Sequence, residues 1–166
     1  MDLSVVVPVK DEEENIASLI DEICAALDGL CQYEIVYVDD GSTDETWKSL
    51  VALSQGLSQL KIIRHRKSYG QSNAIHTGVK AARSSLIVTL DGDGQNDPGD
   101  IPRLVEVYNA PNRPSDLQLV IGHRIKRRDS WVKRASARVA NGVRGYLLKD
   151  RPPDTGCGLK LFPRKI

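Results

Sequence analysis

Residues 86–97 read LIVTLDGDGQND, and the rest of the chain is arranged around this stretch. The apolar run 86–90 predicts a buried strand, and Asp91 and Asp93 follow at its carboxyl end, where open parallel sheets bind their ligands. Strand alternation would place both carboxylates on one side, with Gly92 allowing another backbone or a ligand to approach closely. Two neighbouring acids favour a bound cation, and their hard oxygens suit Mg²⁺ or Mn²⁺ better than zinc. A D-x-D taken alone is a solvated turn about as often as it is a cation site, so the interpretation depends on the residues that surround it.

Hydrophobic patterns on both sides of this stretch alternate between strand and helix. Strands are predicted at 3–9, 34–39, 61–65, 86–90, 117–122 and 159–162, and helices at about 15–28, 42–53, 70–82, 101–108 and 131–147. Ser42 and Glu45 have the spacing of a capping box, and Asp100 is the predicted N-cap of the helix at 101–108. Strands that alternate with helices in this way predict βαβ units, and therefore an α/β fold with a mostly parallel sheet.

Composition limits the classes of protein that the chain can represent. It has 166 residues, 40% of them hydrophobic, which fit one domain with a core. Its net charge of +1 gives no overall positive potential that would attract nucleic acid. The three cysteines, Cys24, Cys31 and Cys157, lack C-x-x-C spacing and predict free thiols in a reducing cytosol. The sequence has no signal peptide and no run of about 18 apolar residues that would span a membrane.

Acidic side chains also follow two other predicted strands, as Asp11-Glu12 and as Asp39-Asp40. Because the carboxyl ends of parallel strands share one edge of a sheet, we expect these acids and the D-x-D to converge on one crevice. So many acids are stable together only with a cation or a donor-rich ligand, and a magnesium-bound nucleotide diphosphate meets both conditions. The chain has no P-loop and no G-x-G-x-x-G, which favours a nucleotide held through metal and carboxylates.

Simpler interpretations of some acids stay open. Residues 11–14 also fit an acidic first turn favoured by the helix dipole. Asp40 also fits a plain turn residue before Gly41, which makes Asp39 the better ligand candidate of that pair. An EF-hand at 91–102 is excluded, because Asn96 stands where glycine is required and Pro102 where a bidentate glutamate is required.

Four motifs, in order along the chain, resemble one known family. They are VVPVKDEEENI at 6–16, VDDGSTD at 38–44, GQSNAIHTG at 70–78 and LDGDGQ at 90–95. Together they resemble the inverting family 2 glycosyltransferases of the GT-A fold, and among these the dolichyl-phosphate mannose synthase group, which loads a sugar onto a polyprenyl phosphate. The resemblance implies a Rossmann-like sheet with helices on both faces, a donor such as GDP-mannose or a UDP-hexose, and Mg²⁺ or Mn²⁺.

The resemblance also implies roles for individual residues. The donor would be bound by Pro8, Val9, Glu12, Asp39, Asp40, Gly70, Gln71 and Asp91. Asp39 would hold the base or the ribose, with Asp40 beside it. The metal would be bound by Asp91, Asp93 and Gln95, and the catalytic centre would include Asp93 and Asp154. Because a phosphate nucleophile is already anionic at neutral pH, Asp154 would position the acceptor more than deprotonate it.

A strongly basic segment lies between His123 and Arg138. Its seven Lys and Arg residues against Asp129 predict capture of a lipid phosphate at an anionic membrane surface, with Arg124 and Arg134 as the phosphate contacts. A nucleic-acid patch and a solvated loop are the alternatives, but no set of base-stacking aromatic residues accompanies the segment. The interpretation predicts a cytoplasmic enzyme that is peripheral at the inner face of the membrane and has no nucleic-acid partner.

The predicted function is therefore a metal-dependent, inverting transfer of a hexose from a nucleotide-diphosphate sugar to dolichyl or undecaprenyl phosphate. Alternatives are a family 2 transferase with a glycan or cell-wall acceptor, and a non-catalytic nucleotide-sugar sensor. Another is a phosphohydrolase of the haloacid-dehalogenase type, although that family expects its D-x-D on the first strand and Thr or Val in place of Gln95. Members of the resembling family usually continue beyond PDTGCGLK, so residues 1–166 are expected to form one nucleotide-sugar-binding domain truncated at its carboxyl end.

Overall fold

The computed structural model describes residues 2–122 and 157–165. In chain order the elements are β1 (Leu3–Val9), α1 (Ile16–Leu27), β2 (Tyr33–Asp39), α2 (Thr46–Ser54), β3 (Leu60–Arg64), α3 (Gln71–Ala81), β4 (Leu86–Thr89), the 3₁₀ turn η1 (Pro98–Asp100), α4 (Ile101–Asn109), β5 (Val120–Ile121) and β6 (Lys160–Pro163). The basic segment, the predicted helix at 131–147 and the site candidates Arg124, Arg134 and Asp154 lie outside the described residues.

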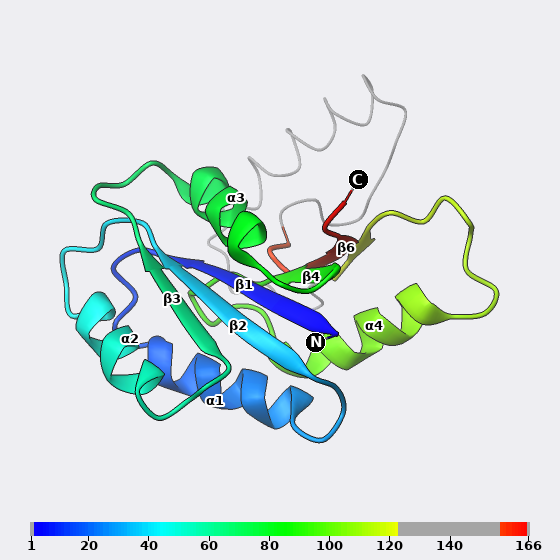
Figure 1. Ribbon diagram of the computed structural model, residues 1–166, viewed down its shortest axis with the longest axis horizontal. Helices are drawn as coiled ribbons and strands as arrows, with labels where there is room; N and C mark the ends of the chain where they lie inside the picture. Colours follow the sequence, from blue (N-terminus) through cyan, green and yellow to red (C-terminus); the bar gives the residue numbers. More distant parts are fainter. Residues whose placement is uncertain (1, 123–156, 166) are drawn as a thin grey trace, which may run out of the picture.

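The described strands form one sheet in the order β3-β2-β1-β4-β6-β5. Strands β3, β2, β1 and β4 are parallel to their neighbours, whereas β6 runs antiparallel to both β4 and β5. The predicted mostly parallel sheet is confirmed, although the strand expected at 117–122 is reduced to Val120–Ile121. Because β2, β1 and β4 are parallel neighbours, the loops that follow them meet at one edge of the sheet (Figure 1).

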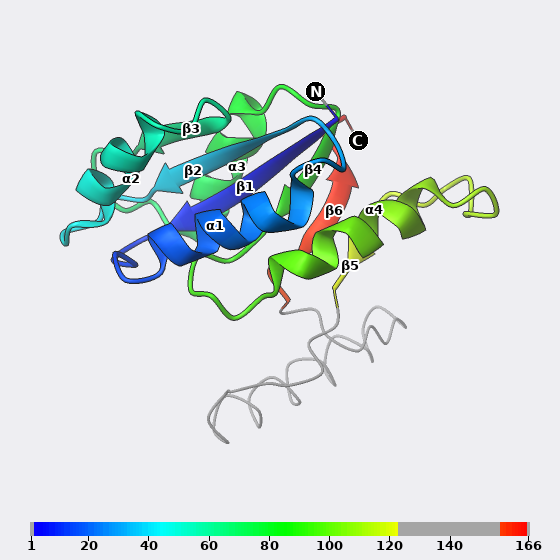
Figure 2. The same cartoon turned by 90° about the horizontal axis from the view of Figure 1, so that it is seen from below.

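Helices cover both faces of this sheet, as Figures 1 and 2 show. β1 alternates between the faces: Val5 and Val7 belong to the core shared with Ile23 of α1 and Leu50 of α2, whereas Val6 belongs to the smaller core under α3. A central parallel strand is expected to be buried on both sides in this way. In the part of the chain that the structure describes, no helix is long and apolar enough to cross a lipid bilayer.

The start of α2 differs from the sequence prediction. The capping box of Ser42 and Glu45 does not form, because the Ser42 hydroxyl instead accepts the backbone N–H of Asp11 at 2.9 Å. The first turn is capped by Asp44, whose Oδ1 accepts the N–H of Thr46 at 3.0 Å. A contact across the fold has therefore displaced a cap that local spacing alone favoured.

The start of α4 also differs from the prediction, because the 3₁₀ turn η1 precedes it. Asp97 caps this turn by accepting the N–H of Gly99 at 2.8 Å. Asp100, the predicted N-cap, makes no capping hydrogen bond with its side chain. Capping has moved three residues toward the amino end, to the residue that begins the extra turn.

Close packing of α3 on the sheet depends on Gly78. A Cβ added at this position would lie 2.4 Å from Cγ1 of Val6 and 3.2 Å from Cγ2 of Val38. We expect Gly78→Ala to lower the free energy of unfolding by about 1 to 2 kcal/mol, since an extra methyl fits a tight core only with strain. Gly56→Ala is the matched control, because the nearest atom to its added Cβ is 4.0 Å away. Urea denaturation compares the two variants, and equal stabilities would contradict the packing described.

Candidate functional site

A cavity of about 370 Å³ lies at the edge of the sheet where β1, β2 and β4 end. Its lining comes from the end of β1, from the loops after β1, β2 and β4, and from the loop that leads into α3 together with the start of that helix. The lining residues are Pro8, Val9, Lys10, Glu12, Asp40, Ser68, Gly70, Gln71, Ala74, Asp91, Gly92 and Asp93. The structure thus brings together acids from all three predicted clusters, as the order of strands and helices indicated.

Most, but not all, of the predicted donor-binding and metal-binding residues line this cavity. Every predicted donor-binding residue except Asp39 lines it, and so do the predicted metal ligands Asp91 and Asp93. Gln95, the third predicted ligand, is absent from the lining, and its backbone N–H donates to Oδ1 of Asp93 at 3.1 Å. Asp11 is also absent from the lining. Each of the first two acidic pairs therefore contributes one carboxylate, Glu12 or Asp40.

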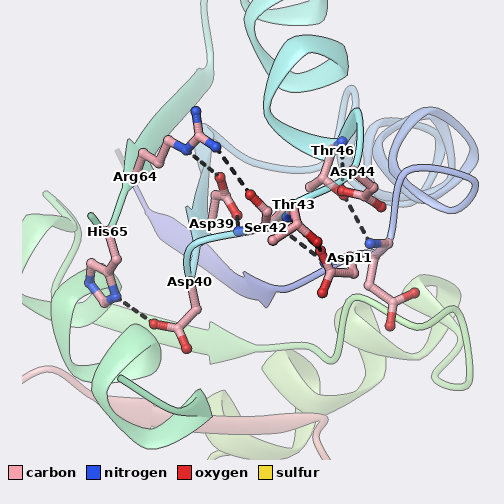
Figure 3. Close-up of polar contacts among 10 residues, drawn as sticks. Asp11, Asp39, Asp40, Ser42, Thr43, Asp44, Thr46, Arg64 and His65 are labelled. Atoms are coloured by element: carbon pink, nitrogen blue, oxygen red, sulfur yellow. Dashed lines mark hydrogen bonds and ion pairs between the residues drawn. The ribbon is translucent and has the colours of Figure 1, made fainter. Parts of the chain in front are cut away.

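Asp39 is fully buried, with 0% of its side chain exposed. Its Oδ1 accepts the N–H of Ser42 at 2.8 Å, and its Oδ2 forms an ion pair with Nε of Arg64 at 3.0 Å. Arg64 also donates to the carbonyl oxygen of Ser42 at 3.1 Å, which closes the cluster (Figure 3). In the structure Asp39 thus holds the loop between β2 and α2, and its contact with a base or ribose stays a prediction.

Asp40 faces the cavity, yet its oxygens are also hydrogen-bonded within the protein. Oδ1 lies 2.7 Å from Nδ1 of His65 and accepts the N–H of Tyr69 at 2.9 Å. Oδ2 accepts the hydroxyl of Ser68 at 2.7 Å and the N–H of Gly70 at 2.8 Å. Burial alone would raise the pKa of Asp40, but these hydrogen bonds outweigh burial and lower its pKa to about 2. The ionised carboxylate therefore anchors the loop that leads into α3.

The loop after β1 is joined to the loop after β2 by a second set of hydrogen bonds (Figure 3). Asp11, whose φ is 54°, accepts the N–H of Thr43 at 2.7 Å. The backbone N–H of Glu12 donates to Oγ1 of Thr46 at 2.9 Å. Asp11 therefore ties the two loops together, while Glu12 lines the cavity.

Asp91 is held through both carboxylate oxygens. Oδ1 accepts from Nε2 of Gln71 at 2.8 Å, and Oδ2 accepts from Nδ2 of Asn96 at 3.3 Å. Asn96 is only 4% exposed, and its Oδ1 accepts the thiol of Cys157 at 3.4 Å. Sequence reasoning missed Asn96 as a functional candidate, although an amide so close to a D-x-D was a visible signal.

The turn that carries the D-x-D is not a continuation of the strand. The sequence predicted that strand alternation would place Asp91 and Asp93 on one side. β4 ends at Thr89, so alternation does not extend to these two residues, although both line the cavity. A Cβ added at Gly92 would lie 2.3 Å from Cγ1 of Val9 and 3.1 Å from the carbonyl oxygen of Pro8. The close approach expected at this glycine is confirmed.

The oxygens at this turn fit a divalent cation that is shared with a ligand. Among residues 2–122 and 157–165, no group of three or more His, Cys, Asp or Glu is placed to hold a metal alone. Mg²⁺ is usually bound by one or two carboxylates together with substrate phosphates. Asp91 and Asp93 provide such carboxylates at the cavity wall, and the remaining positions would be filled by phosphate oxygens and water.

The carboxylate of Asp91 packs directly against Gly158, at the position where a side chain would begin. A Cβ at Gly158 would lie 2.0 Å from Oδ2 of Asp91. We expect Gly158→Ala to push this carboxylate aside and to weaken binding of a metal–nucleotide complex, tested with Mn²⁺ and either UDP or GDP, about 10-fold, since positioning of a ligand carries part of metal affinity. Calorimetric titration measures the affinity, with Gly56→Ala as the control. Unchanged affinity in the alanine variant would show that the contact does not position Asp91.

Comparison with known proteins shows the family. The model of the family described as glycosyl transferase family 2 matches residues 4–166. The chain is 34% identical over 170 residues to a dodecaprenyl-phosphate galacturonate synthase of Rhizobium johnstonii, a match that covers 100% of this chain and 49% of the relative. It is 37% identical over 166 residues to an undecaprenyl-phosphate 4-deoxy-4-formamido-L-arabinose transferase of Edwardsiella ictaluri, with 99% and 50% covered. It spans about half the length of these curated relatives.

A solved structure shows the same fold. It is the crystal structure of glucosyl-3-phosphoglycerate synthase from Mycobacterium tuberculosis with Mn²⁺, UDP and glucosyl-3-phosphoglycerate. The TM-score is 0.73 at 24% identity, and the match covers 99% of this chain and 57% of that chain. The predicted GT-A fold, a mostly parallel sheet between helices, is confirmed. This chain belongs to glycosyl transferase family 2.

Proposed function

We propose that the chain forms the donor-binding part of an inverting, metal-dependent glycosyltransferase that moves a hexose from a nucleotide-diphosphate sugar to a polyprenyl phosphate. One observation carries the proposal: Glu12, Asp40 and the Asp91–Asp93 turn come from three strand ends to one cavity. Family 2 membership supports glycosyl transfer over the phosphohydrolase alternative. The names of both curated relatives contain a polyprenyl phosphate, which supports that acceptor over a glycan.

The donor's diphosphate would lie at the turn after β4, where Asp91 and Asp93 line the cavity. When bound there, a divalent cation neutralises the charge that develops on the leaving diphosphate. Gln71 and Asn96 hold the carboxylate of Asp91 in place through its two oxygens. Binding of Mn²⁺ and UDP by the structural relative from M. tuberculosis supports this assignment of metal and nucleotide.

The transfer itself needs little proton chemistry. A phosphate oxygen of the acceptor forms a bond to the anomeric carbon while the bond from that carbon to the diphosphate oxygen breaks, and its electron pair leaves with the nucleoside diphosphate. Attack opposite to the leaving group inverts the anomeric configuration. Asp154 and the phosphate contacts Arg124 and Arg134 remain predictions for the acceptor side, together with a location at the cytoplasmic face of a membrane, where a polyprenyl lipid is accessible.

The first experiment tests donor binding separately from transfer, because the chain spans only half of its relatives. The purified chain is titrated calorimetrically with UDP and GDP, and with their hexose derivatives, in Mn²⁺ and in EDTA. We expect binding of at least one nucleotide in Mn²⁺ and loss of binding in EDTA. Transfer is then measured with undecaprenyl phosphate in detergent. If no nucleotide binds in a metal-dependent way, the proposal is wrong. Donor binding without transfer would favour a sensor or an incomplete enzyme.

A further inference from the structure

A second cavity of about 310 Å³ adjoins the first. Gln71 and Asp91 line both cavities and so form a common wall between them. The other described residues around the second cavity are Ser72, Ile75, Thr89, Gly158, Lys160 and Phe162. It therefore lies between the first half of α3 and the antiparallel strands β4 and β6, and the donor site assigned above does not use it.

Lys160 brings a positive charge to this cavity. It pairs with Thr89 across the β4–β6 ladder, and Phe162 pairs with Ile87 two positions along. Residues two apart on a strand share a face, and Phe162 packs with Ile87 on the face covered by α3. Within the residues described, Lys160 forms no ion pair with a carboxylate. Lys160 thus lines the cavity without an ion-pair partner among these residues.

The two cavities differ in charge and in polarity. The first is lined by several carboxylates, with Lys10 as a cation, and an anion would enter it only as a metal complex. The second has one carboxylate, Asp91, and one ammonium group, Lys160. Ser72 adds a hydroxyl donor, and Ile75 and Phe162 add apolar walls. This combination suits a ligand with an anionic head and a hydrocarbon next to it.

The common wall also sets the direction of approach. In an inverting transfer the nucleophile approaches the anomeric carbon from the side opposite to the leaving diphosphate. If the diphosphate is bound at Asp91 in the first cavity, the second cavity lies on the other side of the wall formed by Gln71 and Asp91. The acceptor would then enter from the second cavity.

We propose that the second cavity binds the phosphate monoester head of the acceptor, with the ammonium group of Lys160 as its counter-charge and Ile75 and Phe162 against the first isoprene unit. This inference rests on the proposed function, and it adds a phosphate contact to those predicted in the basic segment. A carboxylate on the donor sugar has the same chemistry as a ligand for Lys160, so the test must separate the two anions.

The test compares Lys160→Gln with Lys80→Gln, which removes an exposed charge from the last turn of α3. Farnesyl phosphate is titrated into each protein in the presence of Mn²⁺ and UDP, with farnesol as the probe that lacks the phosphate. We expect Lys160→Gln to weaken farnesyl phosphate binding about 10- to 100-fold, the usual effect of losing a charge-assisted contact. Lys160→Arg is expected to restore most of the affinity, whereas Lys80→Gln and farnesol are expected to show no such loss.

Further outcomes identify which claim fails. Equal farnesyl phosphate affinity in wild type and Lys160→Gln, or no binding by wild type while UDP binds with Mn²⁺, would overturn the inference and leave the donor site intact. If Lys160→Gln instead weakens UDP-glucuronate relative to UDP-glucose, the anion at Lys160 belongs to the sugar and the acceptor assignment is wrong. Failure of every nucleotide to bind with Mn²⁺ would remove the proposed function itself, and the acceptor assignment with it.

Discussion

Replacement of Asp91 by asparagine is expected to weaken Mn²⁺-dependent binding of UDP, or of GDP if that is the nucleotide that binds, about 100-fold or more. Both oxygens of this carboxylate accept amide hydrogens, from Gln71 at 2.8 Å and from Asn96 at 3.3 Å. An asparagine has one oxygen, so its own NH₂ group would face one of these two donors and turn the side chain. A neutral amide oxygen is also a weaker ligand for a divalent cation than a carboxylate oxygen.

Calorimetric titration of UDP in Mn²⁺ measures the effect, and far-UV circular dichroism with urea denaturation confirms that the variant is folded. Asp116→Asn is the matched control, because Asp116 is exposed in the loop before β5 and away from both cavities. We expect this control to bind UDP like the wild type. If Asp91→Asn keeps its metal-dependent UDP affinity, the turn after β4 does not hold the metal.

Replacement of Asp40 by asparagine is expected to lower the free energy of unfolding by about 2 to 3 kcal/mol at neutral pH. The pKa of Asp40 falls from the ordinary value of 3.8 to about 2 in the folded protein, although burial alone would raise it. Each pKa unit corresponds to about 1.4 kcal/mol. The side chain is 5% exposed, so solvent screens this contribution little. An asparagine also leaves some of the donors at Ser68, Tyr69 and Gly70 without an acceptor.

The pH dependence separates the charge from other effects of the substitution. A carboxyl group whose pKa is lower in the folded state stabilises the protein above its unfolded pKa, and this stabilisation is lost as the pH falls toward the folded pKa. The stability difference between wild type and Asp40→Asn should therefore shrink between about pH 4 and pH 2. Urea denaturation across this range, with Asp116→Asn for comparison, measures it. A difference that stays constant with pH would contradict a role for the ionised carboxylate.

The same substitution should also affect the donor site. Asp40 holds the backbone at Tyr69 and Gly70, and the next residue, Gln71, donates to Asp91. Release of this loop is expected to reduce UDP affinity about 10-fold even where the protein remains folded. Wild-type affinity in a folded Asp40→Asn protein would show that the loop is positioned by other contacts.

The sequence by itself determined the elements and the edge of the sheet at which the acids lie. Periodicity placed β1, β2 and α1 within a residue or two of their observed ends, because each pattern depends on neighbouring residues alone. The order of strands and helices required a mostly parallel sheet, and in such a sheet the loops after β1, β2 and β4 must meet at one edge. The position of the D-x-D after a strand was therefore sufficient to predict the edge of the sheet at which Asp91 and Asp93 lie.

Only the tertiary structure decided which acid of each pair faces the cavity. Asp39 is paired with Arg64 and Asp11 with Thr43, whereas Asp40 and Glu12 line the cavity. The contact between Asn96 and Cys157 joins residues 61 positions apart, and Gly158 packs on Asp91 from the far end of the chain. A buried polar group bonds to whichever partner the fold brings within reach. Sequence periodicity predicts which face of a helix or strand a residue occupies. It does not predict which distant residue will contact that residue in the folded protein.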